Sequence, residues 1–146
     1  MQIKDSVNVA FFLKLMAQKK PYKQAIVFPH TKDKQGNISY THYTFKQLDY
    51  YSDLIANGLE KYGIKKGTKT ILMVRPSLDF FSIFFAMFKS GIVPVLIDPG
   101  IGIKNLKFCI NQVEPEAFIG IPKAHIARLL FSWGRKSIKK NYYCWK

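Results

Sequence analysis

The chain has 146 residues, of which 48% are hydrophobic and 22% are charged, and its formal net charge at pH 7 is +14. This length suits one domain, and this apolar content excludes intrinsic disorder as the default state. The longest strongly apolar window, residues 78–87, is far shorter than the roughly 18 residues that a membrane span needs. Because the start also lacks the layout of a secretory signal, a cytoplasmic protein is expected.

Half of the net charge lies in residues 123–146, which contain seven basic residues and no acid. Basic tails of this kind bind nucleic acid or anionic membranes in some proteins. A lysine-rich, solvated end of the chain is the more ordinary explanation. The seven residues are Lys123, Arg128, Arg135, Lys136, Lys139, Lys140 and Lys146.

The first third of the chain predicts a helix followed by a β-hairpin. Apolar residues at helical spacing indicate a helix from Ser6 to Gln18, which Pro21 ends. Residues 24–28 and 37–45 then have the composition of strands, and the polar segment between them is rich in turn formers. We therefore expect two antiparallel strands here.

The next segment carries the clearest helix signals of the chain. Thr44 and Gln47 have the spacing of a capping box, in which each side chain satisfies a free donor at the helix start. Gly63 is suited to the position just after the helix. One apolar stripe is expected along this helix: Leu48, Tyr51, Ile55, Leu59 and Tyr62.

From residue 70 onward, short apolar strands alternate with helices. This alternation predicts an α/β fold, in which an N-terminal helix and β-hairpin precede βαβ units that form a parallel sheet. Pro94 cannot donate to a strand ladder, so it must lie in an edge strand, at the start of a strand or at an irregularity. Strands are expected at 70–74, 92–98 and 117–121, and helices at 78–90, 103–113 and 123–133.

The expected domain organisation has two parts. Residues 1–122 are predicted to form the α/β subdomain. Residues 123–146 are predicted to form a basic helix and an irregular tail, in which the last six residues, "NYYCWK", do not continue the alternation. Such an ending is typical of a frameshift or a premature stop.

Ligands of open parallel sheets bind at the carboxyl ends of the strands. The chain places Arg75–Ser77 and Asp98–Gly100 at two such ends. Arg75 is a candidate anion contact, although capping a neighbouring carbonyl is the more ordinary role, and Asp98 before a proline is typical of a turn. Neither G-x-G-x-x-G nor G-x-x-x-x-G-K-[ST] occurs, and Gly100–Gly102 is the nearest approach to a phosphate motif.

The histidines and cysteines form no recognisable site. His30, His42 and His125 lie far apart in different predicted elements. Cys109 and Cys144 make neither a disulfide framework nor a zinc site, and Cys109 is expected to be a small buried hydrophobe. No catalytic, cofactor-binding or metal-binding residue is therefore assigned.

The order of several segments resembles a known family. "YTFKQLDYYSDLIANGLEKYGIKKGTKTILMVRPSLDFFSIFFAMFKSGIVPVLIDPG" resembles the N-terminal part of the AMP-forming adenylate-forming enzymes, which include acyl-CoA synthetases, luciferases and peptide-synthetase adenylation domains. The similarity covers about residues 40–122. "MVRPSLDFFSIFFAMFKSGIVPVLIDPG" and "FIGIPKAH" look like the β-lactone synthetases of olefin pathways and related fatty-acid–CoA-ligase-like proteins. One helix carries the pattern L-x-x-x-S-x-x-x-A-x-x-L at Leu48, Ser52, Ala56 and Leu59.

The resemblance implies a chemistry for full-length relatives. In that family ATP and a carboxylic acid form an acyl-adenylate and pyrophosphate, and the acyl group then passes to a thiol or, in the β-lactone type, the 3-hydroxyl closes a ring. The phosphate loop with its lysine, the segment that binds adenine and magnesium, the ribose aspartate and the catalytic lysine all follow the region seen here. ATP and magnesium are thus implied only for a full-length relative, and no family catalytic residue falls on this chain.

The leading hypothesis is therefore a truncated, N-terminal fragment of an ATP-dependent ligase that activates fatty acids or other carboxylates and is inactive alone. A second hypothesis is a split ligase, whose remainder is a separate partner chain. A third is a basic module that uses 123–146 on nucleic acid or on an anionic membrane surface, and membrane contact is suggested because Ile126, Leu129, Leu130 and Trp133 give its helix an apolar side. No specific nucleic acid is predicted.

Overall fold

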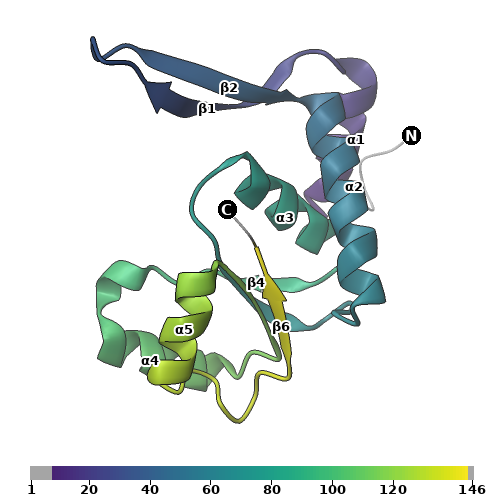
Figure 1. Cartoon of the computed structure of the whole chain (residues 1–146). Coiled ribbons are helices and arrows are strands. Elements are labelled where there is room, and N and C mark those ends of the chain that lie inside the picture. Colours follow the sequence, from purple (N-terminus) through teal and green to yellow (C-terminus); the bar gives the residue numbers. More distant parts are fainter. Residues whose placement is uncertain (1–7, 145–146) are drawn as a thin grey trace. The chain divides into compact units, whose positions relative to one another are not determined.

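The computed structural model describes residues 8–144 (Figure 1). The chain forms two compact units: the first contains the residues up to Gly58 together with Pro76–Lys89, and the second contains Leu59–Arg75 and the residues from Ser90 onward. Helix α1 spans Ala10–Lys19 and ends before Pro21, as predicted. The Asn8 side chain accepts a hydrogen bond from the Ala10 amide (2.9 Å) at its start, whereas the predicted cap, Ser6, lies outside the described residues.

The predicted hairpin is confirmed. Strands β1 (Gln24–Lys32) and β2 (Ile38–Thr44) pair antiparallel. The first strand extends further than expected, because the turn is confined to the residues around Asp33. The Asp33 carboxylate accepts hydrogen bonds from the amides of Gln35 (2.9 Å) and Asn37 (2.8 Å), and this closes the turn.

Helix α2 spans Phe45–Lys61 and begins with the predicted capping box. The Gln47 amide donates to Thr44 Oγ1 (3.3 Å), and the Thr44 amide donates to Gln47 Oε1 (2.9 Å). Gly63 follows the helix with φ +88°, a conformation that favours glycine. The Ile64 amide donates to the Leu59 carbonyl (2.9 Å) across this glycine, which completes the predicted C-terminal cap.

The apolar stripe expected on α2 is partly wrong. Leu48 and Leu59 are buried, but Tyr51 and Tyr62 are 39% and 48% exposed. Ser52 is fully buried instead, and it tolerates burial because its hydroxyl donates to the Asp49 carbonyl (2.9 Å).

Helix α3 spans Leu78–Lys89, close to the predicted range. Ser77 caps it, since its Oγ accepts a hydrogen bond from the Phe80 amide (3.1 Å). Lys89 joins this helix to α2: its Nζ lies 2.6 Å from Asp49 Oδ1 and 2.7 Å from Asp53 Oδ1.

The second unit contains a four-stranded parallel sheet with the strand order β4-β3-β5-β6. The prediction of an α/β fold with a parallel sheet is confirmed. Pro94 lies in the edge strand, as its missing N–H requires, and that strand is shorter than the predicted 92–98. The elements are β3 (Lys69–Met73), β4 (Val93–Val95), the short 3-10 helix η2 (Pro99–Ile101), α4 (Ile103–Val113), β5 (Ala117–Gly120), α5 (Pro122–Leu130) and β6 (Lys140–Tyr143).

The structure differs from the sequence prediction in the last segment. Residues 140–143 form strand β6, which pairs with β5 in parallel, so the alternation continues where an irregular tail was expected. Two side chains hold the strand: Tyr62 Oη donates to the Asn141 carbonyl (2.6 Å), and His125 Nε2 lies 3.0 Å from the Tyr142 carbonyl. The proposed division of the chain at residue 122 stays a prediction.

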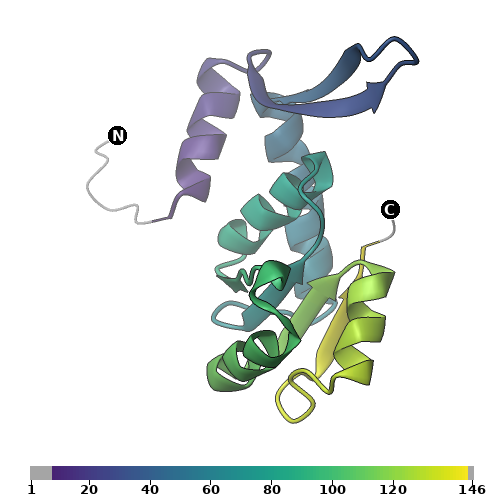
Figure 2. The same ribbon diagram turned by 90° about the vertical axis from the view of Figure 1, so that its left-hand side faces the viewer.

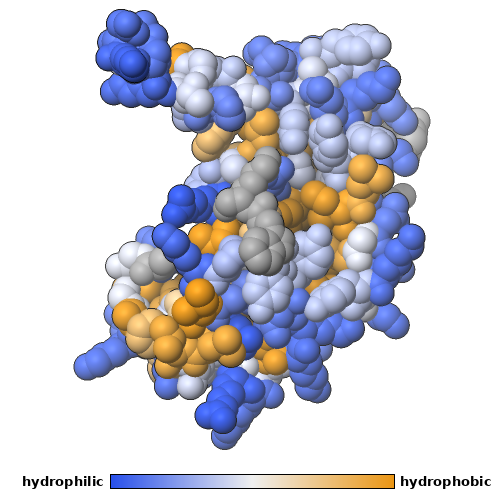
Figure 3. Space-filling model, viewed as in Figure 1, coloured by the Kyte–Doolittle hydropathy of each residue, from blue (hydrophilic) through white to orange (hydrophobic). Residues whose placement is uncertain are grey.

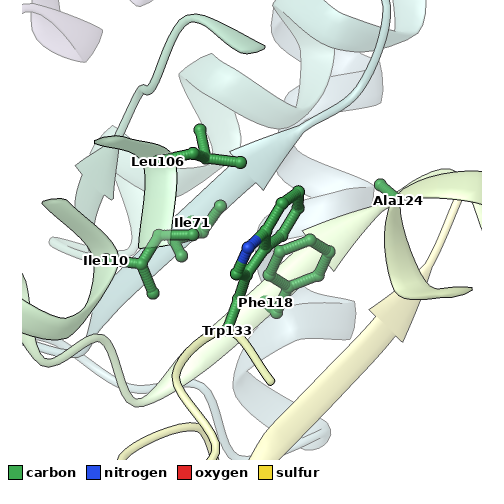
Figure 4. Packing of buried hydrophobic residues seen from close by; sticks show 6 residues of the cluster. All are labelled: Ile71, Leu106, Ile110, Phe118, Ala124 and Trp133. Atoms are coloured by element: carbon green, nitrogen blue, oxygen red, sulfur yellow. The ribbon is translucent and has the colours of Figure 1, made fainter. Parts of the chain in front are cut away.

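The core of the second unit lies between the sheet and the helices α4 and α5, which cover one face of the sheet (Figures 1 and 2). All four residues of β5 are buried, as expected for an interior strand of a parallel sheet. None of the helices in residues 8–144 is long and apolar enough to span a membrane. The central cluster consists of Ile71, Leu106, Ile110, Phe118, Ala124 and Trp133 (Figure 4).

Candidate functional site

The carboxyl ends of β3, β4, β5 and β6 share one edge of the sheet, because the strands are parallel. This is the edge at which open α/β sheets bind ligands. Arg75 follows β3, Asp98 follows β4, and Ile121 follows β5. These residues are therefore the first candidates for contacts with a ligand.

Asp98 is a turn former, as predicted. Its Oδ1 accepts a hydrogen bond from the Gly100 amide (2.8 Å), and the residue caps the short helix η2. Gly102, at the end of the "GIG" segment, has φ +87° and precedes α4 without a side-chain cap. These residues connect β4 to α4 and form no phosphate-binding loop.

Arg75 is exposed after the end of β3. Its guanidinium makes no hydrogen bond or ion pair to any residue within 8–144, so the expected carbonyl cap is not formed. Arg75 therefore presents an exposed positive charge at this edge, and such a charge suits an anionic ligand.

His125 is buried, and its contacts are structural. Its ring stacks on Tyr143 with a centroid separation of 3.9 Å and meets Phe118 edge-on at 4.9 Å. Burial lowers the pKa of the imidazole, although the hydrogen bond to the Tyr142 carbonyl opposes this shift. The neutral ring therefore ties α5 to β6.

The other histidines and the cysteines do not complete a site. His30 and His42 are exposed on β1 and β2, in the first unit, whereas His125 lies in the second. Cys109 and Cys144 form no disulfide within the described residues, and Cys109 is only half-buried rather than buried as expected. Within residues 8–144, no three His, Cys, Asp or Glu side chains gather closely enough to hold a metal ion.

The donor set of the described residues does not fit magnesium–ATP. It offers no group of three or more metal-ligating side chains, and the sequence has no phosphate-loop motif. We therefore derive no reaction step through ATP from this chain.

The first unit contains an apolar pocket of ≈ 340 Å³ that the sequence did not predict. It lies among α1, β1, α2 and α3, and all its lining residues are hydrophobic. The only hint in the sequence was the density of phenylalanines in α3. The lining residues are Val9, Phe12, Leu13, Met16, Ala25, Ile26, Phe45, Leu48, Phe81 and Phe85.

A second hollow, of ≈ 350 Å³, lies at the end of α5 and in the turn after it. Here the walls include two arginines, and sequence reasoning missed it entirely. Arg128 Nε is buried there without a hydrogen-bond partner in the described chain. Burial lowers the pKa of this guanidinium.

Comparison with known proteins identifies the family of this chain, which the residues at the sheet edge do not reveal. The family described as AMP-binding enzyme matches residues 13–142. An olefin beta-lactone synthetase from Stenotrophomonas maltophilia is 46% identical over 128 residues, which are 86% of this chain and 23% of that protein. An olefin beta-lactone synthetase from Xanthomonas campestris pv. campestris is 41% identical over 143 residues, which are 94% of this chain and 26% of that protein.

A solved structure supports the fold. The fatty acyl CoA synthetase of Mycobacterium tuberculosis superimposes with a TM-score of 0.74 over 94% of this chain and 26% of its own, at 17% identity. The chain thus spans about a quarter of the length of the curated relatives that it matches. The resemblance seen in the sequence is confirmed, and the chain belongs to the AMP-binding enzyme family, of which it represents an N-terminal part.

Proposed function

We propose that this chain is the N-terminal part of a ligase that activates a fatty acid or a related long-chain carboxylic acid as its acyl-adenylate. The observation that carries the proposal is the 46% identity to an olefin beta-lactone synthetase over 128 residues. That identity covers 86% of this chain and is far above the 17% shared with the superimposed synthetase.

We further propose that the 146 residues alone do not catalyse adenylation. The described residues offer no donor set for magnesium–ATP, and the exposed cation at the sheet edge, Arg75, cannot replace one. The contribution of this segment is scaffold: it supplies a rigid sheet edge against which the remaining parts of such a ligase are assembled.

A chimaera tests both statements. Residues 13–142 of this chain replace the matching segment of the Stenotrophomonas maltophilia protein, and pyrophosphate exchange is measured with ATP, magnesium and long-chain 3-hydroxy acids. We expect exchange from the chimaera and only background from the isolated 146-residue chain. Exchange by the isolated chain would contradict its proposed inactivity, and a soluble, folded but inactive chimaera would contradict the assignment to this chemistry.

The other two hypotheses are not favoured by any contact in the structure. A separate chain that carries the remainder of the ligase stays a prediction. A nucleic-acid module gains no support, because much of the basic segment lies within α5 and β6 of the α/β unit.

A further inference from the structure

The hollow beside α5 has an unusual polar lining. It is formed by Arg128, Leu129, Ser132, Trp133 and Arg135, all of which belong to the second compact unit. Its volume of ≈ 350 Å³ lies at the lower end of the range of small-molecule pockets. The polar groups of the lining decide which ligand it would accept.

Arg128 is a charged side chain that lacks a counter-ion. Its Nε is buried with no hydrogen-bond partner, and its guanidinium carbon lies 5.8 Å from the centroid of the Phe118 ring. No carboxylate within residues 8–144 forms an ion pair with it. Since removing a charge from water without a partner is costly, this arrangement favours the binding of an anion.

Two more donors face no internal acceptor. The Ser132 hydroxyl and the Arg135 guanidinium make no hydrogen bond to the described residues. Ser132 also has φ +55°, in the left-handed region where glycine is the residue of lowest strain. The surrounding segment, residues 123–146, contains no acid that could neutralise the two arginines.

We propose that this hollow binds a phosphate group. Guanidinium groups recognise phosphate oxygens through paired hydrogen bonds, and a hydroxyl adds a third donor. The phosphate would belong either to a soluble molecule or to a lipid headgroup. A lipid headgroup fits because Leu129 and Leu130, at the hollow and next to it, are 65% and 73% exposed, and hydrophobic residues gather over α5 (Figure 3).

The test measures binding to the full 146-residue chain at constant ionic strength. One arm titrates inorganic pyrophosphate by calorimetry, with sodium acetate as the anion control. The other arm measures co-sedimentation with phosphatidylcholine vesicles that contain phosphatidic acid. In the arm that contains the correct source of phosphate, we expect saturable binding. Its affinity should fall by about tenfold or more in Arg128→Met and in Arg135→Met, the loss typical of one charged hydrogen bond.

Lys139→Met is the matched control, because Lys139 is an exposed cation of the same segment that does not line the hollow. It removes the same charge, and we expect its affinity to stay within about twofold of the unchanged chain, as for an unpaired surface charge. If Arg128→Met fails to fold, Arg135→Met decides, since Arg135 is exposed and supports no core contact.

Saturation by pyrophosphate assigns a soluble ligand, and saturation by vesicles alone assigns a lipid headgroup. The proposal is overturned if neither probe saturates, or if Lys139→Met weakens binding as much as Arg135→Met does. The latter result would mean that the net charge of +14 attracts anions without a site. In nitrogen-edited spectra, the Arg128 Nε–H resonance is expected to move on saturation and to keep its position in acetate.

Discussion

The β1–β2 hairpin and the β3–β6 sheet are both β-structure, yet they depend on different forces. In the hairpin, Val27 and Tyr40 are 51% and 63% exposed, so side-chain burial contributes little. Backbone pairing, the Asp33 turn and a contact between the Thr31 and Ser39 hydroxyls (2.5 Å) hold it. In the sheet, every residue of β5 is buried. The two regions therefore differ chiefly in how deeply their side chains are buried. Substitutions in the sheet should lower the free energy of unfolding more than substitutions in the hairpin do.

The largest difference is expected between two aromatic residues. Phe118→Ala should lower the free energy of unfolding by about 3–5 kcal/mol, because it leaves a cavity in the central cluster. Tyr40→Ala in the hairpin should change it by about 0.5 kcal/mol or less, since that ring is largely in solvent. Urea denaturation followed by circular dichroism measures both. Equal losses in the two variants would show that the contrast in burial does not govern stability.

The next effect concerns the ion pairs between α2 and α3. Lys89→Met should cost about 1–2 kcal/mol, because it leaves the half-buried Asp49 carboxylate without its cation. Asp53→Asn is the matched control, and it should cost about 0.5 kcal/mol or less, since Asp53 is 59% exposed. The same urea titrations measure both. An equal effect of the two substitutions would mean that burial of the pair is unimportant.

A smaller effect should appear in the pH dependence of the sheet unit. Burial lowers the pKa of His125 below its usual 6.5, so the unfolded chain takes up this proton first as the pH falls. The stabilising contribution is complete above pH 6.5 and is lost as the pH falls through the folded pKa. His125→Gln keeps a donor for the Tyr142 carbonyl but cannot titrate. We expect a flatter loss of stability between pH 7 and pH 5 in this variant, measured by thermal unfolding.

If His125→Gln loses as much stability over that range as the unchanged chain, the contribution of His125 to the pH dependence is refuted. Arg128 is part of the same environment, because its charge also lowers the histidine pKa. Arg128→Met should therefore raise the pKa of His125 in the folded chain, so that the loss of stability on acidification occurs at higher pH. This provides an independent check.

The smallest effect is expected in the hairpin turn. Hydrogen bonds from Asn37 lower the pKa of Asp33 below its usual 3.8. The turn is therefore fully supported above pH 3.8 and loses this support as the pH falls through the folded pKa. Amide exchange at Asn37 should rise locally at low pH, while amides of β5 stay protected until global unfolding. Asp33→Ala should show fast exchange at Asn37 at every pH, and slow exchange there would contradict the role of the carboxylate.

The local signals of the sequence predicted most of the fold. The capping box at Thr44, the glycine at Gly63 and the edge position of Pro94 each depend on short-range chemistry, and each was predicted correctly. Strand β6 was missed because a four-residue strand shows no periodicity of its own. It forms because β5 offers a partner and because Tyr62 and His125 hold its carbonyls, and these contacts join residues distant in the sequence.

The candidate sites were harder to predict for the same reason. Asp98 was correctly interpreted as a turn residue, since its partner is two residues away. The solvated state of Arg75 and the hollow at Arg128 and Arg135 depend on where helices end and which acids lie near them. A count of charges indicated an excess of cations in the last segment, but it could not show that two of them line one hollow.

The strand order β4-β3-β5-β6 has a consequence for how the chain is made. Strand β3 lies between β4 and β5, which are both synthesised after it, and β5 ends only at Gly120. At about 5–20 residues per second, the buried strand β3 waits roughly 2–9 s for that neighbour, whereas a hairpin such as β1–β2 closes in about 1–10 μs. During synthesis the hairpin can thus pair its strands at once, while the apolar β3 stays without its neighbour β5 for several seconds.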